Sequence, residues 1–131
     1  MKKDIIIPEV SGIEIAVTLE HNDVHNTEDW YVYLINRKVV DLEMVMIVSQ
    51  GYSDTKKTTT FRKRIDVLPA ISFAKIEMIH PDVFKLKNRF QVSFFQDNQI
   101  FEKTFIFEEN TIKEGALRMI PFLEKRGVVS K

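Results

Sequence analysis

The chain contains no cysteine, which excludes disulfide bonds, thiol nucleophiles and thiolate metal sites together. Glycine and proline are scarce, with four of each in 131 residues, which argues against a disordered or repetitive chain. No apolar run approaches the roughly 20 residues of a membrane-spanning helix. Nineteen basic and nineteen acidic residues cancel, so any electrostatic partner must be met by a local patch.

The first ten residues, MKKDIIIPEV, begin like a signal peptide. Lys2 and Lys3 supply the positive charge, but the apolar run at 5–7 ends at Pro8 and is too short for the apolar region of such a peptide. Since cysteine is also absent, we expect a soluble, cytoplasmic protein. The length predicts one domain, residues 1–131, which would bury about two-thirds of its unfolded surface.

Alternation of apolar and polar residues is the dominant pattern of the chain, and it predicts β-strands. Residues 13–20 alternate in this way and predict a strand with one buried and one solvated face. Residues 30–36, WYVYLIN, predict a central strand covered on both faces, with Trp30 as the large aromatic at the centre of the core. Residues 39–48 predict a strand with Leu42 and Met44 on one face and Val45 on the other.

Two further strands are predicted at 61–68 and 71–79, separated by Pro69, which cannot donate to a strand ladder. Residues 89–107 then predict a hairpin, because Asp97 and Asn98 can adopt the positive φ angles of a two-residue turn. Near the end, Pro121 is able to start a short helical turn.

Seven to eight short strands separated by turns predict an all-β protein. We expect an antiparallel β-sandwich of immunoglobulin or fibronectin type, with a small closed β-barrel as the alternative. The cysteine pair of antibody domains is missing, so the prediction concerns the architecture alone.

The hairpin turn also fixes the register of its two strands, and it pairs Phe95 with Ile100. Most phenylalanines of the hairpin then share a core face. Phe95, Ile100 and Ile106 fall on the opposite face, where a partner, a tail or another strand should cover them.

The stretch GYSDTKKT, residues 51–58, is one residue away from a phosphate-binding loop. Such a loop needs a glycine where Lys56 stands, and a helix after it whose amides face the phosphates. The residues that follow, Thr58 to Phe61, are β-branched or aromatic and favour a strand. We therefore interpret this stretch as a hairpin connection.

Cations and aromatic residues alternate along and after that connection, as in proteins that hold single-stranded nucleic acids. The alternative hypothesis is therefore a weak binder of RNA or single-stranded DNA that uses Tyr52, Lys56, Lys57, Phe61, Arg62 and Arg64. Strand alternation divides these cations, however, since Lys63 points away from its two arginine neighbours. The favoured interpretation is a solvated edge strand whose charges discourage edge-to-edge pairing.

A third hypothesis is a metal-dependent enzyme. His21, Asp23 and His25 lie two residues apart and would share a face if the chain were extended. The His-x-Asp pair, together with the distant His80, also imitates the facial triad of non-haem iron enzymes. The competing interpretation is a surface connection rich in turn-forming residues.

Several segments carry a resemblance to known proteins: DWYVYLIN, SFAKIEMI, RFQVSFFQDNQIFEKTFIFEENTIKE, the basic loop and the closing Gly127-Val128-Val129. Over nearly its whole length the chain resembles a family of small uncharacterised bacterial proteins, some labelled phenylalanyl-tRNA synthetase alpha subunit. A class II synthetase core needs helices and an arginine-bearing ATP site, and no segment here fits them. The resemblance therefore implies one domain and adds no site.

Catalytic motifs are scarce, with no G-x-S-x-G elbow, H-E-x-x-H pair or dinucleotide fingerprint in the sequence. The leading hypothesis is a non-enzymatic protein without a cofactor that acts by protein association. Its partner is expected to be itself, as a homodimer or other homo-oligomer.

Overall fold

The computed structural model describes residues 10–131, so the prediction about the leading lysines lies outside the described residues. Nine strands and two short 3₁₀ helices make up this part of the chain. They are β1 (Ile13–Asn22), β2 (Thr27–Asn36), β3 (Leu42–Tyr52), β4 (Phe61–Leu68), β5 (Ser72–Ile79), η1 (Pro81–Lys85), β6 (Lys87–Gln96), β7 (Gln99–Phe107), η2 (Glu114–Ala116), β8 (Arg118–Ile120) and β9 (Lys125–Ser130). In residues 10–131, no helix combines the length and the apolar character needed to cross a membrane.

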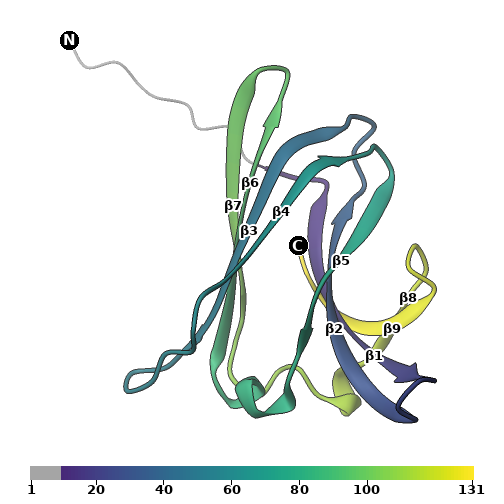
Figure 1. The fold of residues 1–131 in the computed structure, drawn as a ribbon, viewed down its shortest axis with the longest axis vertical. Coiled ribbons are helices and arrows are strands. Elements are labelled where there is room, and N and C mark those ends of the chain that lie inside the picture. The colour runs from purple at the N-terminus through teal and green to yellow at the C-terminus, as the bar shows by residue number, and fades with distance from the viewer. Residues whose placement is uncertain (1–9) are drawn as a thin grey trace.

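The strands form two sheets that face each other (Figure 1). One sheet has five strands in the order β5-β2-β1-β9-β8, and the other has four in the order β4-β3-β6-β7. Every neighbouring pair is antiparallel. The chain crosses between the sheets after β2, β4, β5 and β7. This confirms the predicted β-sandwich, and the sheets of residues 10–131 do not close into a barrel.

The core lies between the sheets and takes side chains from the inner face of each. Its most deeply buried large aromatics are Phe90, Phe94 and Phe105 of β6 and β7. Trp30 also belongs to the core, with its ring edge-on to that of Phe84 at 5.0 Å. The large aromatics of the interior thus come mainly from the β6–β7 hairpin, whereas we expected Trp30 at its centre.

The β6–β7 hairpin has the predicted turn and register. Asp97 and Asn98 adopt φ angles of 52° and 62°. Phe95 lies opposite Ile100, and Phe90 opposite Phe105. The predicted register agrees with the structure because a two-residue turn allows its flanking strands only one register.

The predicted face assignment of β3 is wrong because of a β-bulge at its start. Met44 has a φ of 48°, and the register with β6 shifts between Glu43 and Met46. The extra residue places Leu42 and Val45 on the same buried face, although they are three residues apart. Met44 is exposed as a result.

The predicted solvated face of β1 is also wrong. Ala16 and Thr18 of that face are fully buried. A second apolar cluster covers the outer side of the five-stranded sheet, and it consists of Ala16, Tyr33, Ile35, Ile120 and Leu123. The last two belong to the β8–β9 hairpin, whose turn replaces the predicted helical turn at Pro121 and is closed by Glu124 N–H donating to Ile120 O at 2.8 Å. We call this C-terminal segment the cover hairpin.

Candidate functional site

The predicted partner-binding residues lie on the outer face of the four-stranded sheet. Phe95 and Ile100 are cross-strand neighbours, and Ile100 is 59% exposed. Ile106 is 42% exposed and lies opposite Arg89, six residues further along β7, which corresponds to about 20 Å. The three residues therefore share a face but do not form one patch.

Phe95 and Ile100 belong to a row of side chains that crosses all four strands. Glu43 of β3 lies opposite Phe95 on one side and opposite Val67 of β4 on the other. Val67 is 47% exposed. Because directly opposed residues share a face, Val67, Glu43, Phe95 and Ile100 form one line, which we call the apolar row. The row ends in an exposed aliphatic side chain at each edge of the sheet.

A second row runs parallel to the first and ends in opposite charges. It contains Arg64, Met46, Ser93 and Glu102, in the order β4-β3-β6-β7. Glu102 Oε1 accepts a hydrogen bond from Gln91 Nε2 at 2.6 Å. We call this line the charged row, since it ends in Arg64 on one edge strand and in Glu102 on the other. Arg64 Nε lies 3.7 Å from Asp66 Oδ1 of its own strand in an exposed ion pair.

The stretch GYSDTKKT lies in the β3–β4 hairpin, as predicted: Gly51 and Tyr52 end β3, and residues 53–58 belong to the connection. Thr58 N–H donates to Gly51 O at 2.8 Å, and Ser53 N–H donates to Lys56 O at the same distance. The connection extends away from the body of the sandwich (Figure 1). A strand follows it where a phosphate-binding loop would need a helix.

The residues proposed for nucleic-acid binding do not gather on one surface. Arg62 and Arg64 lie on the outer side of β4, opposite Val48 and Met46. Phe61 and Lys63 lie on the inner side, opposite residues that face the core. Lys56 and Lys57 are exposed in the β3–β4 connection.

Tyr52 is already in contact with a cation of its own sheet, because the Arg89 guanidinium lies 5.4 Å from its ring centroid. The strand that carries Arg62 and Arg64 is an edge strand. Its charges are therefore placed where they can discourage edge-to-edge pairing.

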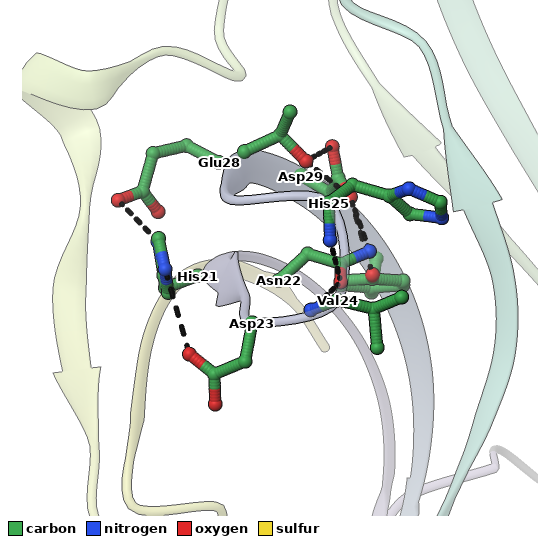
Figure 2. Close-up of polar contacts among 9 residues, drawn as sticks. His21, Asn22, Asp23, Val24, His25, Glu28 and Asp29 are labelled. Carbon is green, nitrogen blue, oxygen red and sulfur yellow. Dashed lines mark hydrogen bonds and ion pairs between the residues drawn. The ribbon is translucent and has the colours of Figure 1, made fainter.

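The predicted metal ligands surround the β1–β2 turn without a common centre (Figure 2). His21 Nε2 lies 3.4 Å from Asp23 Oδ1, and His21 Nδ1 lies 3.4 Å from Glu28 Oε1. The His25 side chain points to the other side of the turn. The backbone N–H of His25 donates to Asn22 Oδ1 at 3.3 Å. In residues 10–131 no three histidine or acidic side chains are placed to hold a metal, so this geometry gives the metal hypothesis no support.

His80 has a local structural role at the start of η1. Its Nδ1 accepts a hydrogen bond from Asp82 N–H at 3.1 Å, which caps the helix. Asp82 Oδ2 lies 3.4 Å from the same nitrogen. His80 follows the end of β5 that pairs with the start of β2, and it lines a pocket with Glu28 and Asp29. In residues 10–131 it nevertheless joins no group of three side chains that could hold a metal.

A polar network lies beside the cover hairpin on the outer side of the five-stranded sheet. Glu20 Oε2 accepts hydrogen bonds from Thr18 Oγ1 and Tyr33 Oη, both at 2.7 Å. Its other oxygen lies 3.2 Å from Lys125 Nζ. Burial alone would raise the pKa of Glu20, but these hydrogen bonds outweigh burial and lower the pKa below its ordinary value.

A pocket of about 340 Å³ opens between β3, β5 and the β3–β4 connection, and it contains a carboxylate that the sequence did not reveal. Glu77 Oε2 accepts a hydrogen bond from Ser49 Oγ at 2.7 Å, which joins the two sheets. Burial raises the pKa of Glu77, and the bond from Ser49 offsets this in part.

A β-bulge is the reason that Glu77 points inward. The register between β2 and β5 shifts at Tyr33, so that Lys75 lies opposite Tyr33 and Glu77 lies opposite Val32. Val32 faces the core. The extra residue in β5 therefore places two successive side chains, Ile76 and Glu77, on the inner side.

No family model, curated protein or solved structure matches this chain. The resemblance to the bacterial family therefore stays a prediction.

The sequence contained one indication of the pocket. Strict alternation from Phe73 would place Glu77 on the outer face with Lys75. The apolar residues Ile76 and Ile79 are three positions apart, which breaks this period and is typical of a bulge. Ser49 offered no such indication, because its contact with Glu77 depends on how the sheets pack.

Proposed function

We propose that this protein acts by associating with a second copy of itself through the outer face of its four-stranded sheet. The observation that carries the proposal is the pair of rows on that face. One row exposes Val67 and Ile100 at its two ends, and the parallel row carries Arg64 and Glu102 at the same two edges.

The arrangement is self-complementary under a two-fold axis that runs parallel to the strands between two facing sheets. Such an axis places β4 of one copy over β7 of the other, because it reverses the strand order. Val67 then meets Ile100 of the second copy, and Arg64 meets Glu102. Each contact occurs twice, as an isologous interface requires.

The size of the face predicts a weak dimer. Four strands spaced about 4.8 Å apart and about 20 Å of strand length give on the order of 400 Å² per copy. Stable interfaces bury roughly 800 Å² per partner. Association is therefore expected in the micromolar range or weaker, and it should depend on protein concentration.

Sedimentation velocity over about ten micromolar to about one millimolar protein tests the proposal. The sedimentation coefficient should rise with concentration for the natural chain, and Ile100→Lys should abolish the rise by placing a charge at the apolar contact. Val24→Lys is the control, because Val24 is also an exposed aliphatic residue but lies in the β1–β2 turn.

A charge exchange tests the orientation of the two copies. Arg64→Glu and Glu102→Arg should each weaken the dimer, since each places like charges opposite one another. The double variant should restore association. A strict monomer at the highest concentration, or a dimer indifferent to Ile100→Lys, would contradict the proposal.

A further inference from the structure

The pocket that contains Glu77 is rich in hydrogen-bond acceptors that residues 10–131 leave without donors. Glu77 accepts a single side-chain hydrogen bond, from Ser49, to its Oε2. Within the described chain no cationic side chain forms an ion pair with it, and the shift of its pKa has burial and Ser49 as its causes. Keeping a half-buried carboxylate ionised without a neighbouring cation costs free energy, and a positively charged group beside it would lower that cost.

Asn88 supplies a second free acceptor to the same pocket. The residue is 4% exposed, and its Nδ2 donates to the carbonyl oxygens of Val83 and Leu86 at 3.0 and 3.1 Å. With both hydrogens used, its Oδ1 is left as an acceptor, and it has no donor among residues 10–131. This oxygen lies toward Gly51, since a Cβ placed there would be 3.3 Å away from it.

Ser49 supplies the third acceptor. Its hydroxyl hydrogen is donated to Glu77, which leaves the lone pairs of Oγ available to another donor. Gly51 follows on the same face of β3, and the absence of a side chain lets Asn88 and Thr58 approach the strand closely, because a Cβ would lie 3.3 Å from Asn88 Oδ1 and 3.2 Å from Thr58 Cγ2. Apolar side chains complete the wall, among them Phe61, Ile79 and Phe90.

We infer that this pocket binds a small organic ammonium ion, a primary amine carried on an apolar body. An ammonium group has three N–H donors and a positive charge, so it matches one carboxylate and two neutral acceptors. The apolar wall suits the attached hydrocarbon. The pocket volume lies in the range of ligand sites of about 300 to 1,000 Å³.

The pocket is independent of the self-association face. Glu77, Asn88 and Ser49 lie on the inner sides of their strands, whereas the apolar and charged rows lie on the outer side of the four-stranded sheet. Failure of one proposal therefore leaves the other intact.

An NMR titration with n-butylammonium chloride tests the inference, with 1-butanol as the neutral probe of the same hydrocarbon length. Saturable shifts are expected at the amides of Ser49, Gly51 and Asn88. The amine should bind about tenfold or more tightly than the alcohol, because a charged hydrogen bond is lost with the alcohol. Potassium chloride at equal ionic strength controls for general salt effects.

Two variants sharpen the titration. Glu77→Gln should weaken amine binding by about tenfold or more while it keeps a hydrogen bond with Ser49. Gly51→Ala should weaken binding of the amine and the alcohol alike, because its methyl group would press on Thr58 and Asn88 and displace these pocket-lining side chains. Glu109→Gln is the matched control, since Glu109 lines a separate polar pocket near Tyr52.

Equal affinity for the amine and the alcohol in the natural chain would overturn the inference, and this comparison needs no variant. Shifts that grow without saturation, or unchanged amine binding in a folded Glu77→Gln protein, would overturn it as well. A ¹H–¹⁵N spectrum with natural dispersion establishes that each variant is folded. If Glu77→Gln does not fold, the natural chain and Gly51→Ala decide the outcome.

Discussion

The outer faces of the two sheets differ in how much of their apolar surface is covered by the rest of the chain. On the five-stranded sheet, Tyr33 and Ile35 lie under Ile120 and Leu123 of the cover hairpin and are buried. On the four-stranded sheet, Ile100 keeps more than half of its surface in contact with solvent. Both faces carry apolar side chains, but in residues 10–131 one of them alone has an intramolecular cover.

The difference shows what an uncovered apolar face implies. In the cover hairpin, β9 pairs with β1 within the five-stranded sheet (Figure 1). Ile120 and Leu123 of the hairpin pack on the outer side of β1 and β2, so the chain itself removes this apolar surface from water. Removing such surface contributes about 25 cal/mol per Å². The four-stranded sheet would gain the same kind of stabilisation from a second copy, which makes its gain depend on concentration.

The largest expected effect comes from truncating one apolar side chain on each face. Leu123→Ala should lower the free energy of unfolding by about 2 to 4 kcal/mol, because it leaves a cavity in the second cluster. Ile100→Ala should change it by less than about 0.5 kcal/mol in dilute solution, where the side chain is exposed. Urea denaturation of both variants measures the difference.

Equal losses for the two variants would contradict the contrast between a covered and an uncovered face. The Ile100→Ala measurement should be repeated near one millimolar, where a dimer adds stability to the natural chain by mass action. A loss that appears only at the high concentration is the expected result.

The close approach of β9 to β1 at Gly127 gives the second test of the contrast between the two faces. A Cβ on Gly127 would lie 2.7 Å from Val17 O, a backbone atom of β1 that cannot move without its ladder. Gly127→Ala should therefore separate β9 from β1 and cost about 1 to 3 kcal/mol. Gly115→Ala is the matched control, since nothing lies within 4 Å of the added atom.

Hydrogen exchange distinguishes a local effect from a global one. In Gly127→Ala the amides of β9 and β1 should exchange faster than those of β6, whose neighbours are in the other sheet. Uniform acceleration across both sheets, or no change at all, would show that the approach at Gly127 does not hold the cover hairpin in place.

Local chemistry explains which parts of the fold were predictable. The hairpin register followed from Asp97 and Asn98, because a tight turn and its flanking strands are adjacent in sequence. The bulge at Met44 was not predictable by the same reasoning. A single added residue reverses the faces of everything that follows, and simple alternation assumes that no residue is added.

Long-range packing explains what was missed at the candidate sites. The cover hairpin buries Ala16 although more than a hundred residues separate Ala16 from Ile120 and Leu123. In the same way, Ser49 and Glu77 meet across two sheets. The cross-strand pair of Phe95 and Ile100 on the outer face was predictable from sequence because the pairing is local.

The smallest expected effect concerns the carboxylate beside the cover hairpin. Tyr33→Phe removes the 2.7 Å hydrogen bond to Glu20 and should lower the free energy of unfolding by about 1 kcal/mol at neutral pH. This is a low value for a hydrogen bond to a charged acceptor, because water reaches part of the network. On the uncovered face, Gln91→Ala removes a bond of similar length to Glu102 and should cost less than about 0.5 kcal/mol, since that pair is exposed.

The stability loss of Tyr33→Phe should depend on pH, and the pKa of Glu20 fixes the direction of that dependence. The folded pKa of Glu20 lies below the unfolded value, so its contribution to stability is present above the unfolded value and is lost as the pH falls through the folded one. The deficit of Tyr33→Phe should therefore shrink in acid, because protonated Glu20 gains less from the phenol. Urea denaturation between pH 7 and about pH 3 measures it, and the ¹³C resonance of the Glu20 carboxyl should show a higher pKa in the variant. A deficit that stays constant over this range would mean that Tyr33 acts through packing in the second cluster and not through the carboxylate.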